Sequence, residues 1–208
     1  NISFKNILLG ETQPPSNLLN SSEFSISTSN LVKTGKNSMY EFSADSLIYN
    51  SARHNVLLKN IRVNPLQEKE AFPQKTGFQT DVASATINFI ELGQINEKRW
   101  LRENILDAQK LKIGSSTLNI FRDKRYPFNH NQRPPWPQKL MKEISQDFVF
   151  DSVQLMPSFV KYSELLSISD EPGFISFDDL AFSGGRLTNM EEELSKSKTF
   201  ELDARARL

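Results

Sequence analysis

Two histidines are the residues of this sequence best suited to general acid–base or metal chemistry, because the chain contains no cysteine. His54 lies in a polar run between two strand-like patterns, which predicts a hairpin tip, and His130 lies among Asn and Pro residues. Neither has a second metal ligand at helical or strand spacing, and no Gly-x-Ser-x-Gly nucleophile elbow accompanies either. We therefore predict two exposed turn histidines. A hydrolase built around His130 and the acidic loops is a competing hypothesis.

Two acidic runs, Asp178-Asp179 and Glu191-Glu192-Glu193, are the other candidates for acid–base or cation chemistry. Neighbouring residues of a strand point to opposite faces, so Asp178 and Asp179 are poorly placed to act on one substrate. The carboxylates of glycosidases converge across roughly 5–9 Å, which adjacent strand positions do not supply. We interpret both runs as solvated surface. The sequence predicts no catalytic, cofactor-binding or metal-binding residue, no cofactor and no enzymatic activity.

Anion-binding chemistry is represented by one short basic cluster and one glycine pair. The run Arg122-Asp123-Lys124-Arg125 could contact a phosphate or a lipid head group, but its mixed charge and its position after a strand favour a solvated strand end. Ser183-Gly184-Gly185 predicts a turn and not a phosphate-binding loop. The chain has 25 basic and 25 acidic residues, so no overall field attracts nucleic acid, which we do not expect as a partner.

The elements that carry these residues must fit within 208 residues, of which 38% are hydrophobic. This length permits a sizeable core. No run approaches the roughly 18–20 apolar residues of a membrane span, and no charged-then-apolar leader opens the chain. Asn1 to Phe4 already have a strand-like pattern without an initiating Met. We therefore expect residues 1–208 to be a single β-rich segment of a longer chain, whose strands continue beyond both ends.

Short runs in which apolar and polar residues alternate are the main secondary-structure signal, and they predict half-buried strands. Such runs occur at 24–27, 57–63, 83–89, 149–155 and 175–177, and most clearly at 200–208. The runs 111–113 and 118–120 flank Gly114-Ser115-Ser116, which predicts a hairpin with a short glycine-containing turn. One apolar face per strand predicts an antiparallel sheet that is covered on one side only.

Two segments have helical patterns. Residues 96–104 contain Trp100 and Leu101 among charged residues and predict a short connecting helix. In residues 136–146, Pro137 suits the first helical turn, and Trp136, Leu140 and Ile144 recur on one face. We predict that this second helix lies against the sheet, after an Asn- and Pro-rich loop at 126–135.

The chain resembles the AsmA-like family of Gram-negative envelope proteins, and in particular its long Bacteroidetes-type members. The resemblance depends on LKNIRVNP at 58–65, on LNIFRDKR at 118–125, and on a final block with FVFDSV at 148–153, VKYSE at 160–164 and PGFISFDDL at 172–180. The most specific part is the Tyr-x-Glu strand followed, about ten residues later, by Gly-x-Ile-x-Phe. Together these motifs cover most of residues 40–190.

The resemblance implies a periplasmic protein, anchored to the inner membrane through a segment absent from this chain. It also implies a mostly β fold, an elongated, curled antiparallel sheet open at both ends with one or two short helices, whose apolar face carries acyl lipid. The expected partners are a phospholipid or another acyl lipid and the remainder of the longer chain. The same alternation would also serve a closed β-sandwich with an adhesion or protein-binding role and no lipid.

Overall fold

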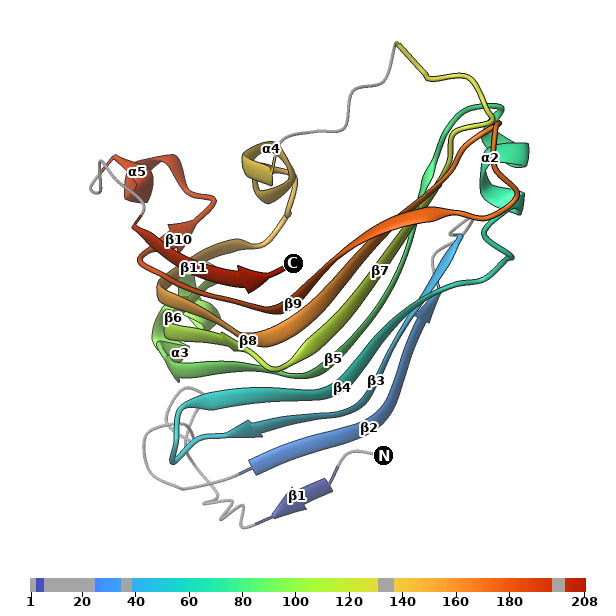
Figure 1. The fold of residues 1–208 in the computed structure, drawn as a ribbon. Helices are drawn as coiled ribbons and strands as arrows, with labels where there is room; N and C mark the ends of the chain where they lie inside the picture. The colour runs from blue at the N-terminus through green and yellow to red at the C-terminus, as the bar shows by residue number, and fades with distance from the viewer. Residues whose placement is uncertain (1–2, 6–24, 35–38, 131–136, 196–200) are drawn as a thin grey trace.

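The computed structural model describes residues 3–5, 25–34, 39–130, 137–195 and 201–208, which form one large curled sheet with short helices around it (Figure 1). The strands are β1 (Ser3–Lys5), β2 (Ser25–Thr34), β3 (Tyr40–Asn50), β4 (Asn55–Pro65), β5 (Asp81–Ile95), β6 (Ile105–Ile113), β7 (Ser116–Asp123), β8 (Asp147–Leu165), β9 (Gly173–Gly184), β10 (Leu187–Thr188) and β11 (Leu202–Arg207). The helices are α2 (Ala71–Thr76), α3 (Glu97–Glu103), α4 (Pro137–Lys142) and α5 (Glu191–Leu194).

The prediction of a mostly β, curled sheet is confirmed. All 11 described strands belong to one sheet, in the order β1-β2-β3-β4-β5-β6-β8-β9-β11, with β7 also between β5 and β8 and with β10 beside β8. The described residues therefore form no second facing sheet, and the closed β-sandwich is not their fold.

The sheet is predominantly antiparallel, as expected, but it is mixed at β8. This strand runs parallel to both β6 and β7, whereas the other described pairs are antiparallel. The physical reason is that Asp147, the first residue of β8, pairs with Ile105, the first residue of β6, so β8 begins at the end of the sheet opposite to where β7 ends. Parallel neighbours need a crossover of about a dozen residues or more.

The predicted hairpin at residues 114–116 is wrong. β6 and β7 are two parts of one strand, because both run antiparallel to β5 in one continuous register. The N–H of Gly114 donates to the carbonyl of Phe89 over 2.8 Å, and the N–H of Asn88 donates to Ser115 over 3.1 Å. A Cβ on Gly114 would lie 2.7 Å from a carbon of the Phe89 ring. This glycine therefore permits close approach within a strand and does not form a turn.

Each long strand changes direction near its middle, along a line that crosses the sheet (Figure 1). Three strand residues near this line have left-handed backbone: Asn30 (φ 55), Asn60 (φ 50) and Asp179 (φ 54). Left-handed residues are costly except for Gly, Asn and Asp, and they bend an extended chain. The registers of β2 to β8 place Asn30 and Asn60 in one line with residues of the neighbouring strands, and Asp179 lies next to this line at a register shift between β8 and β9. We call the line the crease: Asn30, Asp45, Asn60, Asn88, Ser115, Pro157 and Asp179.

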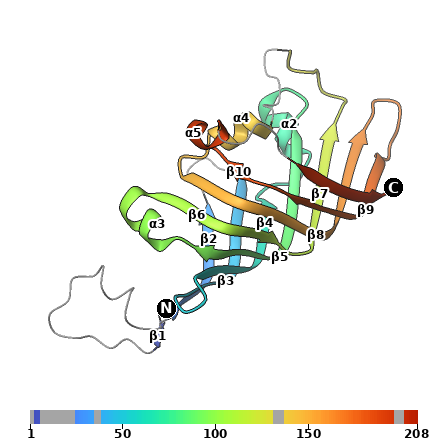
Figure 2. The ribbon, with the colours of Figure 1, turned by 90° about the vertical axis from the view of Figure 1, so that its left-hand side faces the viewer.

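Polar contacts stabilise the crease where β3 meets β4. The Asn60 amide and the Arg62 guanidinium each donate to the Asp45 carboxylate over 2.8 Å. These two donors, Arg62 first, hold the pKa of Asp45 below its ordinary value. The crease divides the sheet into an α3 half, which ends near α3, and an α2 half, which ends near α2 (Figure 2).

The best-buried cluster lies in the α3 half, between β5, β6 and β8. Ile95, Ala108 and Phe150 are at most 7% exposed, and Phe148 stacks on Phe150 with ring centroids 5.1 Å apart. Leu187 of β10 packs against the same cluster. The cluster is small for a sheet of this width, so most apolar side chains of the sheet are only half-buried.

The helix predicted at 96–104 is confirmed as α3, but the helix predicted at 136–146 is shorter than expected. Asn96 caps α3 by accepting a hydrogen bond from the N–H of Arg99 over 3.3 Å. Helix α4 ends at Lys142, and Ile144 beyond it is 48% exposed, so its predicted place on a buried stripe is wrong. The reason is a competing contact, because the Asn189 amide donates to the carbonyl of Ile144. Trp136 lies outside the described residues.

Candidate apolar binding site

An apolar row crosses the α3 half at right angles to the strands. Its members are direct partners in the pairing register, so their side chains share one face. The apolar row consists of Leu47, Leu58, Ile90, Ile113, Leu155, Phe182 and Ala204. All but Ala204, which is exposed, are half-buried. A continuous apolar strip therefore crosses seven neighbouring strands and remains accessible on one side.

A second set of partners widens this strip toward α3. Tyr49, Val56, Leu92, Leu111 and Val153 are aligned across β3, β4, β5, β6 and β8, two residues from the apolar row. The opposite face of the same half is more polar, with Glu91, Lys112, Gln154 and Ser183 as partners in one row. One face of the α3 half is thus apolar, and the opposite face is more polar.

A second set of apolar partners lies in the α2 half, beyond the crease. In the α2 half the aligned apolar residues are Phe42, Val63, Ala85, Leu118, Val160 and Phe177. Val63 is an odd number of residues from Leu58 in β4, and Ala85 is an odd number from Ile90 in β5. The alternation is interrupted between these positions, because Asn60 is left-handed and because the N–H of Asn88 and the carbonyl of Phe89, on consecutive residues, both bond to the same neighbouring strand. The odd spacing therefore marks a change in the phase of the alternation at the crease.

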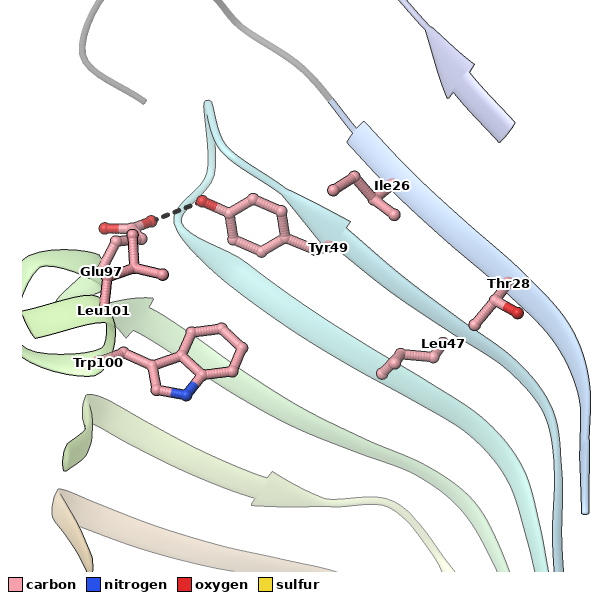
Figure 3. Close-up of a pocket in the computed structure, with 7 residues that line it drawn as sticks. All are labelled: Ile26, Thr28, Leu47, Tyr49, Glu97, Trp100 and Leu101. Atoms are coloured by element: carbon pink, nitrogen blue, oxygen red, sulfur yellow. Dashed lines mark hydrogen bonds between the residues drawn. The ribbon is translucent and has the colours of Figure 1, made fainter. Parts of the chain in front are cut away.

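A pocket opens where the apolar surface of the α3 half meets helix α3 (Figure 3). Its volume is about 250 Å³. It is lined by Ile26 and Thr28 of β2, Leu47 and Tyr49 of β3, and Glu97, Trp100 and Leu101 of α3. Trp100 and Leu101 project from the helix toward β3, although they remain 38% and 63% exposed. The pocket continues the apolar row, since Leu47 belongs to both.

A hydrogen-bonded cluster of three polar side chains, centred on Glu97, lies at the end of this pocket. The Tyr49 hydroxyl donates to Oε1 of Glu97 over 3.0 Å, and Nδ1 of His54 lies 2.7 Å from the same oxygen. Burial, and secondarily the Glu97 carboxylate, raises the pKa of Tyr49 above its ordinary value, so the hydroxyl keeps its proton. This arrangement satisfies the carboxylate beside an otherwise apolar lining.

The histidines lie where the sequence predicted, in exposed connections. His54 lies in the turn between β3 and β4 with its side chain 54% exposed, and its contact with Glu97 was not predicted. His130 is exposed beside Phe128, with ring centroids 5.2 Å apart. In the part of the chain that is described, no group of three or more His, Asp or Glu side chains could hold a metal ion.

The acidic runs are engaged in ion pairs. Asp179 pairs with Arg207 over 3.0 Å, and Glu191 pairs with Lys142 over 2.9 Å, which joins α5 to α4. Glu193 is buried and pairs with Arg186. The Ser183-Gly184 pair lies inside β9, and only Gly185 lies in the bend that follows.

Each cation of the basic cluster also has an acidic partner. Arg122 forms a two-pronged contact with Asp81, Lys124 lies 2.7 Å from Glu164, and Arg125 binds Asp123 through its side chain. The cluster is therefore a neutralised strand end and offers no free cation to an anion. Tyr162 donates to Glu164 over 2.8 Å, and burial raises its pKa to about 12.

Replacing Asp123 by asparagine is expected to lower the melting temperature by a few degrees at pH 7. Asp123 is 1% exposed and accepts hydrogen bonds from the Arg125 side chain and backbone, and these lower its pKa below 3.8. A carboxylate with a lowered folded-state pKa stabilises the fold above its unfolded pKa, and this contribution is lost as the pH falls through the folded pKa. The difference between wild type and Asp123→Asn should therefore shrink below about pH 4.

Calorimetry at a series of pH values checks this expectation. Asp151→Asn, at an exposed position of β8, is the matched control and should change the melting temperature little at any pH. A gap between wild type and Asp123→Asn that stays constant down to pH 2 would contradict the assigned ion pair.

Comparisons with protein-family models, with curated proteins and with solved structures found no match for this chain. Within the described part of the chain, none of the helices has both the length and the apolar composition needed to span a membrane.

Proposed function

We propose that this chain is a non-enzymatic lipid-binding segment of an envelope protein, in which the apolar row and the adjoining pocket shelter an acyl chain of a phospholipid or another acyl lipid. The observation that carries the proposal is the apolar row, which is continuous over seven strands and half-buried in all of them except β11. Contiguous apolar surface of this kind is typical of binding sites on soluble proteins.

The dimensions of the apolar row suit an acyl chain. Neighbouring strands lie about 4.8 Å apart, so six intervals between seven strands span about 29 Å. The hydrocarbon core of a bilayer, built from two opposed acyl layers, is about 30 Å thick. The row is thus longer than one acyl chain. Each methylene that leaves water for the row contributes roughly 0.8 kcal/mol.

The resemblance to AsmA-like proteins supports the cellular setting of the proposal. On that basis the segment acts in the periplasm, anchored to the inner membrane by another part of a longer chain, and contributes to lipid transport or envelope integrity. Carriage of a lipid requires an apolar surface and no bond-making step, so no catalytic residue is assigned.

Fluorescence quenching provides the direct test. The chain has two tryptophans, so Trp136→Phe leaves Trp100, which lines the pocket, as the only one. A fatty acid brominated along its chain should quench this emission in a saturable manner, because bromine quenches tryptophan only at short range. The unbrominated fatty acid should displace it and restore the emission.

Mass spectrometry of organic extracts from the purified protein complements this measurement. Co-purified phospholipid, or another acyl lipid, is the expected result. Quenching that never saturates, together with extracts free of acyl lipid, would contradict the proposal and leave the apolar row as a surface for a protein partner.

A further inference from the structure

A second cavity, of about 520 Å³, lies in the α2 half on the polar face of the sheet. Strands β5, β7 and β8 form its floor, and the segment after β4 forms one wall. The register aligns Ser84, Asn119 and Lys161 as direct partners, and it aligns Phe121 with Ser163 in the next row. Since each row shares a face, hydroxyl, amide and ammonium groups converge on one cavity.

Two lysines line this cavity, and each lies over an aromatic ring. Nζ of Lys161 is 4.2 Å from the ring centroid of Phe174, and Nζ of Lys69 is 4.3 Å from that of Phe121. A ring face attracts an ammonium group without neutralising it, so the rings hold the two cations at the cavity.

Acidic groups cancel these charges only in part. Among the described residues none forms an ion pair with Lys161, and the nearest carboxylate oxygen of Glu70 lies 3.9 Å from Lys69 with both side chains about half-exposed. Glu68 also lines the cavity, so both glutamates lie on the side of Lys69, and Lys161 is the cation without an acidic partner among the described residues. The neighbouring Arg122 and Lys124 differ in this respect, because Asp81 and Glu164 pair with them.

We propose that this cavity binds a phosphate group, held by Lys161 and Lys69 and hydrogen-bonded by Ser84, Asn119 and Ser163. Ammonium groups are suited to phosphate as point charges, and hydroxyl and amide donors complete its hydrogen bonds. Free phosphate and the head group of a phospholipid share this chemistry. The site is independent of the apolar row, because it lies in the other half and uses different residues.

The test is a titration of the isotope-labelled protein, followed by the backbone amide shifts of Ser84, Asn119 and Ser163. Inorganic phosphate is the first ligand, and a short-chain phosphatidylglycerol below its micellar concentration is the second. Both should shift these amides, with an affinity that falls as ionic strength rises. Lys161→Met should weaken binding at least about tenfold, as expected for loss of one charge-assisted hydrogen bond.

Two control variants test whether the loss of affinity depends on the charge and on the position of Lys161. Lys161→Arg retains the charge and should bind nearly as well as the wild type, whereas Lys110→Met, which removes an exposed lysine in the α3 half, should leave affinity unchanged. If Lys161→Met does not fold, Lys69→Met replaces it with the same expectation. Equal affinities for Lys161→Met (or its replacement) and Lys110→Met would overturn the proposal.

The two ligands separate the possible sources. Tighter binding of the short-chain lipid than of phosphate assigns the site to a head group, and equal binding assigns it to free phosphate. Absence of shifts with both ligands overturns the site. Because the acyl-chain test reads Trp100 in the other half, the two proposals succeed or fail separately.

Discussion

Replacing Leu58 and Ile90 together by glutamine is expected to weaken acyl-chain binding at least about 25-fold while the sheet stays folded. The two residues are direct partners in the middle of the apolar row and are half-buried. Two amides under a bound acyl chain would lack hydrogen-bond partners, at a cost of about 1–3 kcal/mol each. Each 1.4 kcal/mol is a tenfold change in affinity. The measurement is the quenching titration of Trp100.

The matched control lies on the other side of the same strands. Ile48 and Leu57 are also direct partners and half-buried, but they are next to Tyr49 and Leu58 in the sequence and therefore face away from the apolar row. The double variant Ile48→Gln, Leu57→Gln should bind like the wild type. Similar losses in both double variants would show that binding does not occur on the face assigned here.

Replacing Gly114 by alanine is expected to destabilise the fold by about 1–3 kcal/mol, the range for an overpacked site. The new Cβ would lie 2.7 and 2.8 Å from two ring carbons of Phe89 and 3.0 Å from its backbone nitrogen. Rotation of the ring can relieve the first two contacts but not the third. For a chain of this length each kcal/mol lowers the melting temperature by about 2–4 °C, which thermal unfolding measures.

Gly173 provides the control for this substitution. It begins β9, and a Cβ there would have nothing within 4 Å, so Gly173→Ala should leave the melting temperature nearly unchanged. Combining Gly114→Ala with Phe89→Ala should give a smaller loss than the sum of the single losses, because the removed ring is one source of the clash. Additive losses would argue against the close approach of β5 to the residues between β6 and β7.

Local periodicity allowed the sequence to determine the class of elements. Alternating runs at 57–63, 83–89 and 149–155 are all in strands, and the segment around Trp100 forms α3 with Asn96 as its cap. The positions of His54 and His130 in exposed connections were also predictable, because polar runs between strand patterns become turns. These properties depend on residues close together in the chain.

Only the tertiary structure decided how the strands pair, and the candidate sites depend on that pairing. A glycine followed by two serines is compatible with a turn and also with a strand that a neighbouring strand approaches closely. The contact of Gly114 with Phe89 of β5 decides for the strand. The apolar row and the contacts of Glu97 with Tyr49 and His54 join residues far apart in the sequence. Alternation specifies that a strand has two unlike faces, but the register between strands determines which faces meet and therefore where a ligand can lie.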